Sequence, residues 1–413
     1  MVAGAGITEA MQIHSPRHNT DLESISDLFA QTFSDYWVWH DYTSDGYLSA
    51  GGYDWEASRV AVVDGRIVGH FGVWERQMRI GSAAVKVAAI GAVATHQLHR
   101  KKGYMEQTAR ACLDGLRDKG YDVTFLFGIP RFYTKFGYVR SFPEAWFFLD
   151  TRDNPGAATV PEHADGPEDL AEFARIYNEE NKTITGTFVR PTYRANRRPK
   201  QYRLRRFADG YLYLRKNGDT LEVVDCAGPP EQVVAVARDV AYKDVCPTIS
   251  FPFLPRRSRV GEYLIAGGHR YDSKQAADGG PMFSIVNLRS TSQKLAPVWA
   301  ERLAKAGWSD YSGSLLLSGN GVNVVLQIDH GRVTVGDVDG HGAARKQVEV
   351  GEDTRTVDGS IRAGTSLVRL FVGDEDPHRI VRQSGATVGG DARFLLPVLF
   401  PHEEPSTIAW DRF

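Results

Sequence analysis

The sequence predicts an α/β (α+β) protein in which helices cover mixed sheets, built as two tandem segments of like plan followed by a different third one. At 413 residues the chain is too long for one ordinary core, since a domain takes roughly 100 to 200 residues. The order helix, strands, helix, strand occurs twice before residue 290, whereas from about Thr291 a helix leads into short apolar strands. We therefore expect three domains, at residues 1–150, 151–290 and 291–413.

Hydrophobic periodicity predicts the elements of the first segment. Apolar residues recur at helical spacing behind the possible cap Asp21, and two strand-like stretches flank the tight turn Asp64-Gly65. In chain order we expect a helix over 22–33, strands over 59–63, 66–74 and 85–95, a helix over 105–116, and strands over 123–127 and 145–149. This order describes a mixed sheet with helices on its faces.

The second segment repeats this plan in the order of its elements, though not in residue identity. It should contain a helix over 167–181, strands over 211–215 and 221–225, a helix over 231–241 and a strand over 248–253. In the third segment we expect a helix carrying Leu295 to Ala306, strands over 314–317, 322–328 and 332–335, and a last helix near 365–372. Bulky Trp410 and Phe413 so near the end predict a tail that docks on the protein.

Composition excludes several classes of function. The net charge is −2, from 49 basic and 51 acidic residues, so no field strong enough to gather nucleic acid is implied. The most basic stretch, Arg190 to Arg206, contains tyrosines and favours domain packing or a subunit contact over nucleic-acid binding. No membrane-spanning stretch or signal peptide is visible, which predicts no membrane partner.

Cysteine and histidine usage predicts no metal. The three cysteines, Cys112, Cys226 and Cys246, show no C-x-x-C spacing, which argues against a zinc site or a disulfide framework and suits a reducing cytoplasm. The histidines stand isolated in the pattern: His70, His96, His99 and His402. We therefore expect a cytoplasmic protein without a metal ion.

A basic turn between a strand and a helix predicts an anion site. The strand Val93-Ala94-Thr95 runs into His99-Arg100-Lys101-Lys102-Gly103-Tyr104, where a helix starts. A helix start gathers unpaired backbone N–H groups and the positive end of the dipole. Gly103 permits close approach of a ligand, and the three cations before it can neutralise a diphosphate. A solvated basic loop is the alternative, but the position between strand and amphipathic helix favours the anion site.

This turn resembles the hallmark of the GNAT superfamily of N-acetyltransferases, [RQ]-x-x-G-x-[GA]. Arg100 and Gly103 match, while Met105 stands where a small residue is usual and would crowd the helix start. The resemblance implies acetyl-CoA as cosubstrate, with its pantetheine arm on the backbone of the central strand and one N–H there polarising the thioester carbonyl. The residues it implies for acetyl-CoA are Val93, Ala94, Thr95, Arg100, Lys101, Lys102, Gly103, Tyr104, Met105, Glu106, Gly128 and Ile129.

A second motif narrows the resemblance. The stretch from Gly128 to Tyr138 contains F-Y-x-x-F-G-Y and is similar to a segment of the enhanced-intracellular-survival (Eis) acetyltransferases. That family implies two fused GNAT-like domains, the second degenerate, and a sterol-carrier-like domain whose C-terminal tail docks in the active site. It also implies a homo-oligomer, a hexamer. The second segment has Cys226-Ala227-Gly228-Pro229-Pro230 in place of the basic turn, so we expect no pyrophosphate there.

The Eis resemblance also implies catalytic roles. Tyr133 would be the general acid and the terminal carboxylate of Phe413 the general base. A protonated amine cannot attack a thioester, so a base must take its proton, and the departing thiolate needs a proton from an acid such as a phenol, with a pKa of about 10. A free α-carboxyl, with a pKa of about 3.5, becomes an adequate base through burial or a water relay.

The acceptor is expected to be a small-molecule or peptide amine. Asp35, Trp37 and Trp39 lie in an acidic, aromatic run after the first helix, and Glu404, with Glu403 and Asp411, could add negative charge from the tail. The aromatic run could equally be a packing surface. Eis-like proteins accept aminoglycosides, polyamines and lysine side chains. The alternative to an enzyme is a regulatory protein that senses acyl-CoA or binds an apolar ligand.

Overall fold

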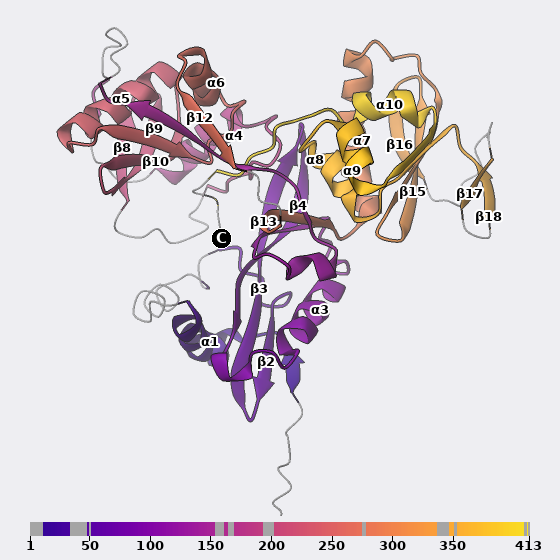
Figure 1. Cartoon of the computed structure of the whole chain (residues 1–413), viewed down its shortest axis with the longest axis horizontal. Coiled ribbons are helices and arrows are strands. Elements are labelled where there is room, and N and C mark those ends of the chain that lie inside the picture. The colour runs from indigo at the N-terminus through magenta and orange to yellow at the C-terminus, as the bar shows by residue number, and fades with distance from the viewer. Residues whose placement is uncertain are drawn as a thin grey trace, which may run out of the picture.

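The computed structural model describes residues 11–33, 48, 51–152, 161–163, 169–192, 202–274, 278–336, 347–350, 353–408 and 411. Their strands form sheets of seven, six, five and two strands. Figure 1 shows the seven-stranded sheet in the middle of the molecule, with the six-stranded sheet on one side and the five-stranded sheet on the other. The predicted mixed α/β fold is confirmed.

The N-terminal sheet has the strand order β1-β2-β3-β4-β5-β13-β6. Its strands are β1 Gln12–His14, β2 Arg59–Val63, β3 Arg66–Ile80, β4 Ala83–Thr95, β5 Val123–Gly128, β6 Val139–Arg140 and β13 Gly280–Ile285. Strands β4 and β5 run parallel, and the other pairs run antiparallel. This sheet extends the predicted strand 66–74 by six residues, to Ile80.

Two helices cover opposite faces of this sheet. Helix α1, His18–Thr32, packs against Trp74 and Ala89, and α3, Tyr104–Leu116, packs against Val73 and Ala88. Since successive strand residues point to opposite faces, the neighbours Val73 and Trp74 serve the two helices separately. Short 3₁₀ turns, η2 Gln97–His99 and η3 Tyr133–Phe136, precede and follow the α3–β5 unit. The predicted cap Asp21 is wrong: α1 begins at His18, and the Asp21 carboxylate accepts the backbone N–H of Arg17 from within the first turn.

The middle sheet has the order β12-β7-β11-β10-β9-β8. Its strands are β7 Glu144–Asp150, β8 Arg203–Phe207, β9 Gly210–Asn217, β10 Thr220–Ala227, β11 Thr248–Pro252 and β12 Arg270–Lys274. Its helices are α4 Leu170–Glu180, α5 Pro230–Lys243 and α6 Arg259–Ala266. As in the first sheet, the parallel pair β10–β11 is joined through a helix, here α5.

The first two sheets exchange a strand. Strand β7, which the sequence places with the first segment, pairs with β11 and β12 of the middle sheet, and β13 pairs with β5 and β6 of the N-terminal sheet. In Figure 1, β13 accordingly lies in the N-terminal sheet, where it pairs with β5 and β6, whereas the preceding strand β12 lies in the middle sheet. Alternation predicts a strand but not its partner, because pairing depends on faces and edges that form only in the folded protein.

The C-terminal sheet has the order β16-β15-β14-β19-β20, with a separate hairpin. The strands are β14 Gly313–Gly319, β15 Val322–Asp329, β16 Arg332–Gly336, β19 Gly359–Arg362 and β20 Thr387–Gly390, and the hairpin is β17 Gln347–Val350 with β18 Asp353–Thr356. The helical elements are α7 Leu288–Lys305, η4 Gly364–Ser366, α8 Leu367–Val372, α9 Pro377–Ser384 and α10 Ala392–Leu399.

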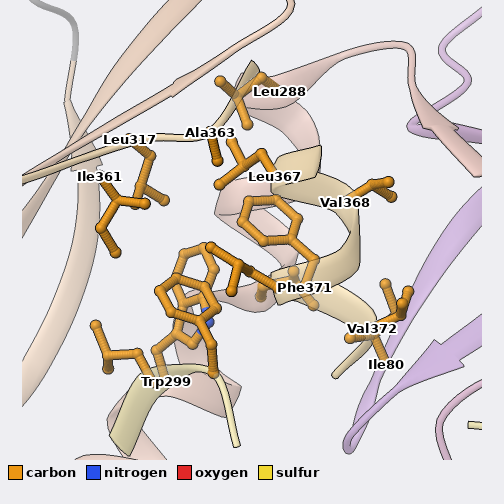
Figure 2. Packing of buried hydrophobic residues seen from close by; sticks show 14 of the residues in the cluster. Ile80, Leu288, Trp299, Leu317, Ile361, Ala363, Leu367, Val368, Phe371 and Val372 are labelled. Carbon is orange, nitrogen blue, oxygen red and sulfur yellow. The ribbon is translucent and has the colours of Figure 1, made fainter. Parts of the chain in front are cut away.

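A single apolar cluster joins this part to the N-terminal sheet. Figure 2 shows Ile80 of β3 beside Val372 of α8, with Phe371 and Trp299 in the same cluster. The Phe371 ring stacks on Phe400 at 5.9 Å between centroids, and Trp299 meets both rings edge-on. These rings pack between α7, α8 and the end of α10.

The tail after α10 docks along the segment that connects α4 to β8. The N–H of Ser406 donates to the carbonyl of Thr185, the Thr407 hydroxyl donates to Gly186, and Ile408 is buried. At Gly186, with φ +93°, a Cβ would lie 2.8 Å from backbone atoms of Ser406, so glycine lets the tail lie close. The tail is thus held on the protein up to Ile408, whereas Trp410 and Phe413, on which the docking prediction rests, lie outside the described residues.

Candidate active site

The parallel strands β4 and β5 part at one end. Their pairing stops at Ile90 and Leu126, although β4 continues to Thr95 and β5 to Gly128. On its other edge β4 stays paired with β3, through Gly69 opposite Thr95 and His70 opposite Ala94. The backbone of the predicted residues Val93, Ala94 and Thr95 is therefore unpaired with β5 and is available to an extended ligand.

A bulge in β4 lies at the point where the strands part. The register shifts between His70 and Gly72 of β3, and Ala92 has φ +46°. A bulge of this kind bends a strand and re-aims its backbone groups. The sequence predicts a cosubstrate-binding strand here, but no local pattern reveals the bulge.

The buried side chain of His70 holds the backbone of the bulge in place. The fully buried ring donates from Nδ1 to the carbonyl of Ala92 over 2.8 Å, and its Nε2 accepts from the Tyr53 hydroxyl over 2.7 Å. Burial lowers the pKa of His70 to about 4, so the ring is neutral at pH 7 and has this tautomer. Gly72 makes room for it, because a Cβ there would lie 2.5 Å from Cε1 of His70. Sequence reasoning found His70 isolated and missed this role, because the contacts join residues far apart in the chain.

The predicted anion turn forms the start of α3. Gly103, with φ +78°, is the cap residue, and no side chain caps the helix. The first described helical hydrogen bond at this end runs from the N–H of Gln107 to the carbonyl of Gly103 over 3.2 Å. The N–H groups of Tyr104, Met105 and Glu106 thus point out of the helix start, as an anion requires.

The basic residues of the turn lie on its surface. Arg100, Lys101 and Lys102 are exposed, and Nε of Arg100 donates to the carbonyl of Thr95 over 3.2 Å. That contact folds the turn back onto the end of β4. Burial, together with Lys102 and His96, lowers the pKa of the neighbouring His99, which keeps that ring neutral. Three cations therefore surround a helix start with free donors.

Two residues of the first helical turn take roles that the sequence did not predict. Met105 packs against the core that α3 shares with the sheet, where its Cε would lie 3.8 Å from a Cβ at Gly69. Its side chain therefore points into the core, so the crowding of the helix start that the sequence predicts does not occur. Glu106 pairs with Arg110 and Lys135 at 2.9 Å, and those hydrogen bonds lower its pKa. Its carboxylate is thus held beside η3.

Tyr133 lies beside the end of β5. A Cβ at Gly128 would approach its ring to 3.0 Å, so this glycine allows the ring to pack on the strand; the next residue, Ile129, is exposed. The Tyr133 ring contacts Phe132 and Tyr138 edge-on at 4.9 and 5.9 Å. Burial raises the pKa of Tyr133 to about 12, and among the described residues its hydroxyl has no hydrogen-bond partner. The structure thus brings Tyr133 to the end of the parted strands, whereas Tyr138 bonds to Thr124.

The remaining predicted site residues divide into two groups. Asp35, Trp37, Trp39 and the terminal Phe413 lie outside the described residues. Glu404 is described, and it forms an ion pair with Arg256 of the middle part. Glu403 likewise pairs with Arg302, and Asp411 pairs with Arg190. The tail carboxylates therefore bind arginines of the protein itself, which leaves them little charge to offer an amine.

The middle sheet has the same parted strands but a different turn. Pairing of β10 with β11 stops at Glu222 and Ser250, and β10 continues to Ala227 with a register shift of its own. Helix α5 then starts with Pro230, which has no N–H, and the N–H of Gly228 donates to the Glu180 carboxylate over 2.9 Å. This turn has lost donors and gained an acidic group, as expected for a degenerate copy.

Within the described ranges, no group of three or more His, Cys, Asp and Glu side chains is placed to hold a metal ion. None of the helices in the described ranges has the length and apolar character needed to cross a bilayer.

Comparison with solved structures shows the fold over nearly the whole chain. A GCN5-related N-acetyltransferase from Kribbella flavida is 16% identical, with a TM-score of 0.70 and coverage of 98% of this chain and 99% of its own. One from Anabaena variabilis is 14% identical (TM-score 0.68, coverage 97% and 99%). Eis1 from Mycobacterium abscessus is 15% identical (TM-score 0.62, coverage 96% and 98%). No curated protein matches the sequence.

The family comparison concerns the part that contains the anion turn. Residues 18–140 match the acetyltransferase (GNAT) domain family. This range includes the two helices that cover the N-terminal sheet, the parted strands, the start of α3 and Tyr133. Residues 18–140 thus match a GNAT acetyltransferase domain, and this match supports an acyltransferase activity for the chain.

Proposed function

We propose that the protein transfers an acetyl group from acetyl-CoA to an amine at the parted end of β4 and β5. This proposal rests on the start of α3, where uncapped N–H groups and three exposed cations follow the end of β4 that is not paired with β5. The pyrophosphate would bind the N–H groups of Tyr104 to Glu106, and the pantetheine arm would follow Val93 to Thr95. Gly128 and Ile129, at the end of the opposite strand β5, would contact the cosubstrate from the other side. Bound there, acetyl-CoA supplies an activated thioester.

Acyl transfer forms an N–C bond and breaks a C–S bond, so one proton must leave the amine and one must reach the thiolate. Tyr133 suits the second task. Because its pKa is about 12, the phenol stays protonated at pH 7, and its hydroxyl has no partner among the described residues that would hold the proton back. We assign Tyr133 as the general acid.

The base is proposed to be the terminal carboxylate of Phe413. This assignment rests on the Eis resemblance and on the docking of the preceding tail residues on Thr185 and Gly186, in the segment that pairs with the end of β3. A buried carboxylate is a better base than an exposed one, because desolvation raises its pKa. The amine would enter near α1, with Asp35, Trp37 and Trp39 contributing to its site, and we propose aminoglycosides, polyamines and lysine side chains as its class.

The finer plan of the chain is proposed on the same resemblance. It comprises a catalytic domain at 1–150, a degenerate one at 151–290 and a sterol-carrier-like one at 291–413, assembled as a hexamer in the cytoplasm. The turn at Pro230 supports a degenerate second domain, because it has fewer N–H donors for a pyrophosphate. The alternative of an apolar-ligand sensor gains nothing from the structure, because aromatic rings already occupy the layer between α7 and α10.

The test measures thiol release from acetyl-CoA across a panel of amines. We expect steady turnover with the wild-type chain, and a fall in kcat of about 100-fold or more for Tyr133→Phe with little change in the KM of acetyl-CoA. Deletion of Phe413 should lower kcat in the same way. Tyr242→Phe, on the exposed surface of α5, serves as the matched control.

Two results would contradict the proposal. Tight binding of acetyl-CoA without turnover on any amine would favour the sensor. Near-normal kcat in Tyr133→Phe or in the chain without Phe413 would reject that residue's role.

A further inference from the structure

One carboxylate joins the start of α3 to the turn that carries Tyr133. Glu106 accepts from Nζ of Lys135 at Oε2 and from Nη2 of Arg110 at Oε1, both over 2.9 Å. Glu106 is the third residue of α3, and Lys135 is the third residue of η3. We call Glu106, Arg110 and Lys135 the α3–η3 bridge.

The α3–η3 bridge holds the Glu106 carboxylate away from the anion site. A glutamate at the third helical position can reach back and accept the backbone N–H of the cap residue. Here the cap residue is Gly103, and no side chain caps the helix. A carboxylate turned back in this way would occupy a donor that a diphosphate needs and would place a negative charge beside it. Lys135 and Arg110 instead bond the carboxylate along the helix, and these hydrogen bonds lower its pKa.

The same bridge holds η3. This element is a single 3₁₀ turn that ends at Gly137, with φ +83°, and a turn so short depends on its neighbours for a fixed conformation. Nζ of Lys135 lies 4.7 Å from the ring centroid of Phe132 and 5.1 Å from that of Phe136. Both rings pack against the core that α3 shares with the N-terminal sheet. Lys135 thus connects the residues on both sides of Tyr133 to α3.

The bridge contributes geometry more than stability. The side chains of Lys135 and Glu106 are 38% and 39% exposed, and exposed ion pairs add little to the stability of a protein. Two cations share this carboxylate, however, and Arg110 also lies over an aromatic ring, 5.5 Å from the centroid of Phe136. The pair is therefore part of a network that links two elements of the site. A change in it should affect binding and rate before it affects folding.

We propose that Lys135 is a positioning residue: by holding Glu106, it keeps the diphosphate site at the start of α3 open and sets the turn that carries Tyr133 against the bound cosubstrate. This inference rests on the proposed binding of acetyl-CoA at α3 and on the proposed role of Tyr133 as general acid. The two effects are separable. A released Glu106 competes with the diphosphate and weakens binding, whereas a loosened η3 misplaces the acid and lowers kcat.

The test combines Lys135→Met with Glu106→Ala in the full chain. Methionine keeps an unbranched side chain over the two rings but loses the charge, so we expect acetyl-CoA to bind about 10-fold more weakly in calorimetry. The kcat of thiol release should fall about 5-fold in the same variant. In the double variant the competing carboxylate is absent, so the affinity should recover to within about twofold of wild type while kcat stays low. Lys135→Arg should retain both quantities.

Two further measurements exclude a general effect of the substitution. In a chain that carries Tyr133→Phe, Lys135→Met should cause no further loss of kcat, because the acid that it positions is absent. Lys243→Met removes the ion pair with Asp239 on α5, the helix at the equivalent place in the middle sheet, and should behave as wild type. Circular dichroism at the assay temperature establishes that each variant is folded.

The outcomes separate this inference from the proposed function. If the wild type binds no acetyl-CoA, or if Tyr133→Phe keeps a normal kcat, the proposed function fails and this inference fails with it. If both proposals hold but Lys135→Met changes neither affinity nor kcat, this inference alone fails. Weak binding that Glu106→Ala does not restore, or an equal loss of kcat in the Tyr133→Phe background, would also overturn it.

Discussion

The starts of α3 and α5 occupy equivalent places in two sheets and differ in their chemistry. Each follows a strand that parts from its parallel neighbour and contains a register shift. The α3 start has Gly103, three exposed cations and uncapped N–H groups, whereas the α5 start has Pro230 and a Glu180 carboxylate on Gly228. The backbone plan is shared, and the side chains of one turn decide which copy can hold a diphosphate.

The bulges of β4 and β10 show the same division between a shared backbone plan and different side chains. At the bulge of β4 a neutral His70 supports the backbone from below and leaves the strand edge free. At the bulge of β10 the buried carboxylate of Asp225 binds Arg190, and the tail packs on that sheet. One copy keeps its edge for a ligand, and the other uses the equivalent region to organise the chain.

The largest expected effect is on stability, at Asp225. Because Asp225→Ala would leave Arg190 short of a partner in a buried site, we expect the free energy of unfolding to fall by about 3 to 5 kcal/mol, with the dissociation constant of acetyl-CoA unchanged. Urea denaturation followed by circular dichroism measures the first quantity and calorimetry the second. A loss of acetyl-CoA affinity in the folded variant would break the contrast between the sheets.

Next is the anion turn itself. Reversing two charges, in Lys101→Glu with Lys102→Glu, should weaken acetyl-CoA binding by about 100-fold, because like charges then face the diphosphate. Calorimetry on the wild type should give one site per chain. The matched control is Glu231→Gln in the first turn of α5, which should leave the affinity unchanged. Undiminished binding by the double variant would contradict the assignment of the turn.

The third effect concerns pH and the β4 bulge. The folded protein keeps His70 neutral down to about pH 4, whereas in the unfolded chain its pKa is 6.5, so the unfolded state takes up a proton first as the pH falls. Stability from this group is complete above pH 6.5 and is lost toward pH 4. From pH 7 to pH 5 we expect a loss of about 2 kcal/mol that His70→Gln does not show. Equal pH slopes in urea denaturation of the two proteins would disprove the buried neutral ring.

The smallest effect is expected at the degenerate turn. Glu180→Gln removes its acidic group, but Pro230 still withholds a donor and no basic run replaces it, so binding should stay at one acetyl-CoA per chain. If calorimetry detects a second acetyl-CoA site, the acidic group alone is what prevents binding at the start of α5.

Much of the catalytic part could be predicted because its signals are local. The strand ending at Thr95, the Gly103 turn and the helix to Leu116 follow one another, and each carries its own pattern. The contacts of Met105 and Glu404 could not be predicted in this way, because each depends on a distant partner: the core beneath Gly69 for one and Arg256 for the other. A side chain's residue type does not reveal what lies opposite it in space.

The sequence by itself determined the α/β class, the basic turn before α3 and the weaker turn before α5, since helix starts and breakers act within a few residues. The tertiary structure alone decided the exchange of β7 and β13, the support of the β4 bulge by His70, and the grip of Arg190 on Asp411, 221 residues away. Those features depend on hydrogen-bond partners and burial that arise only when remote segments pack together, so no local pattern encodes them.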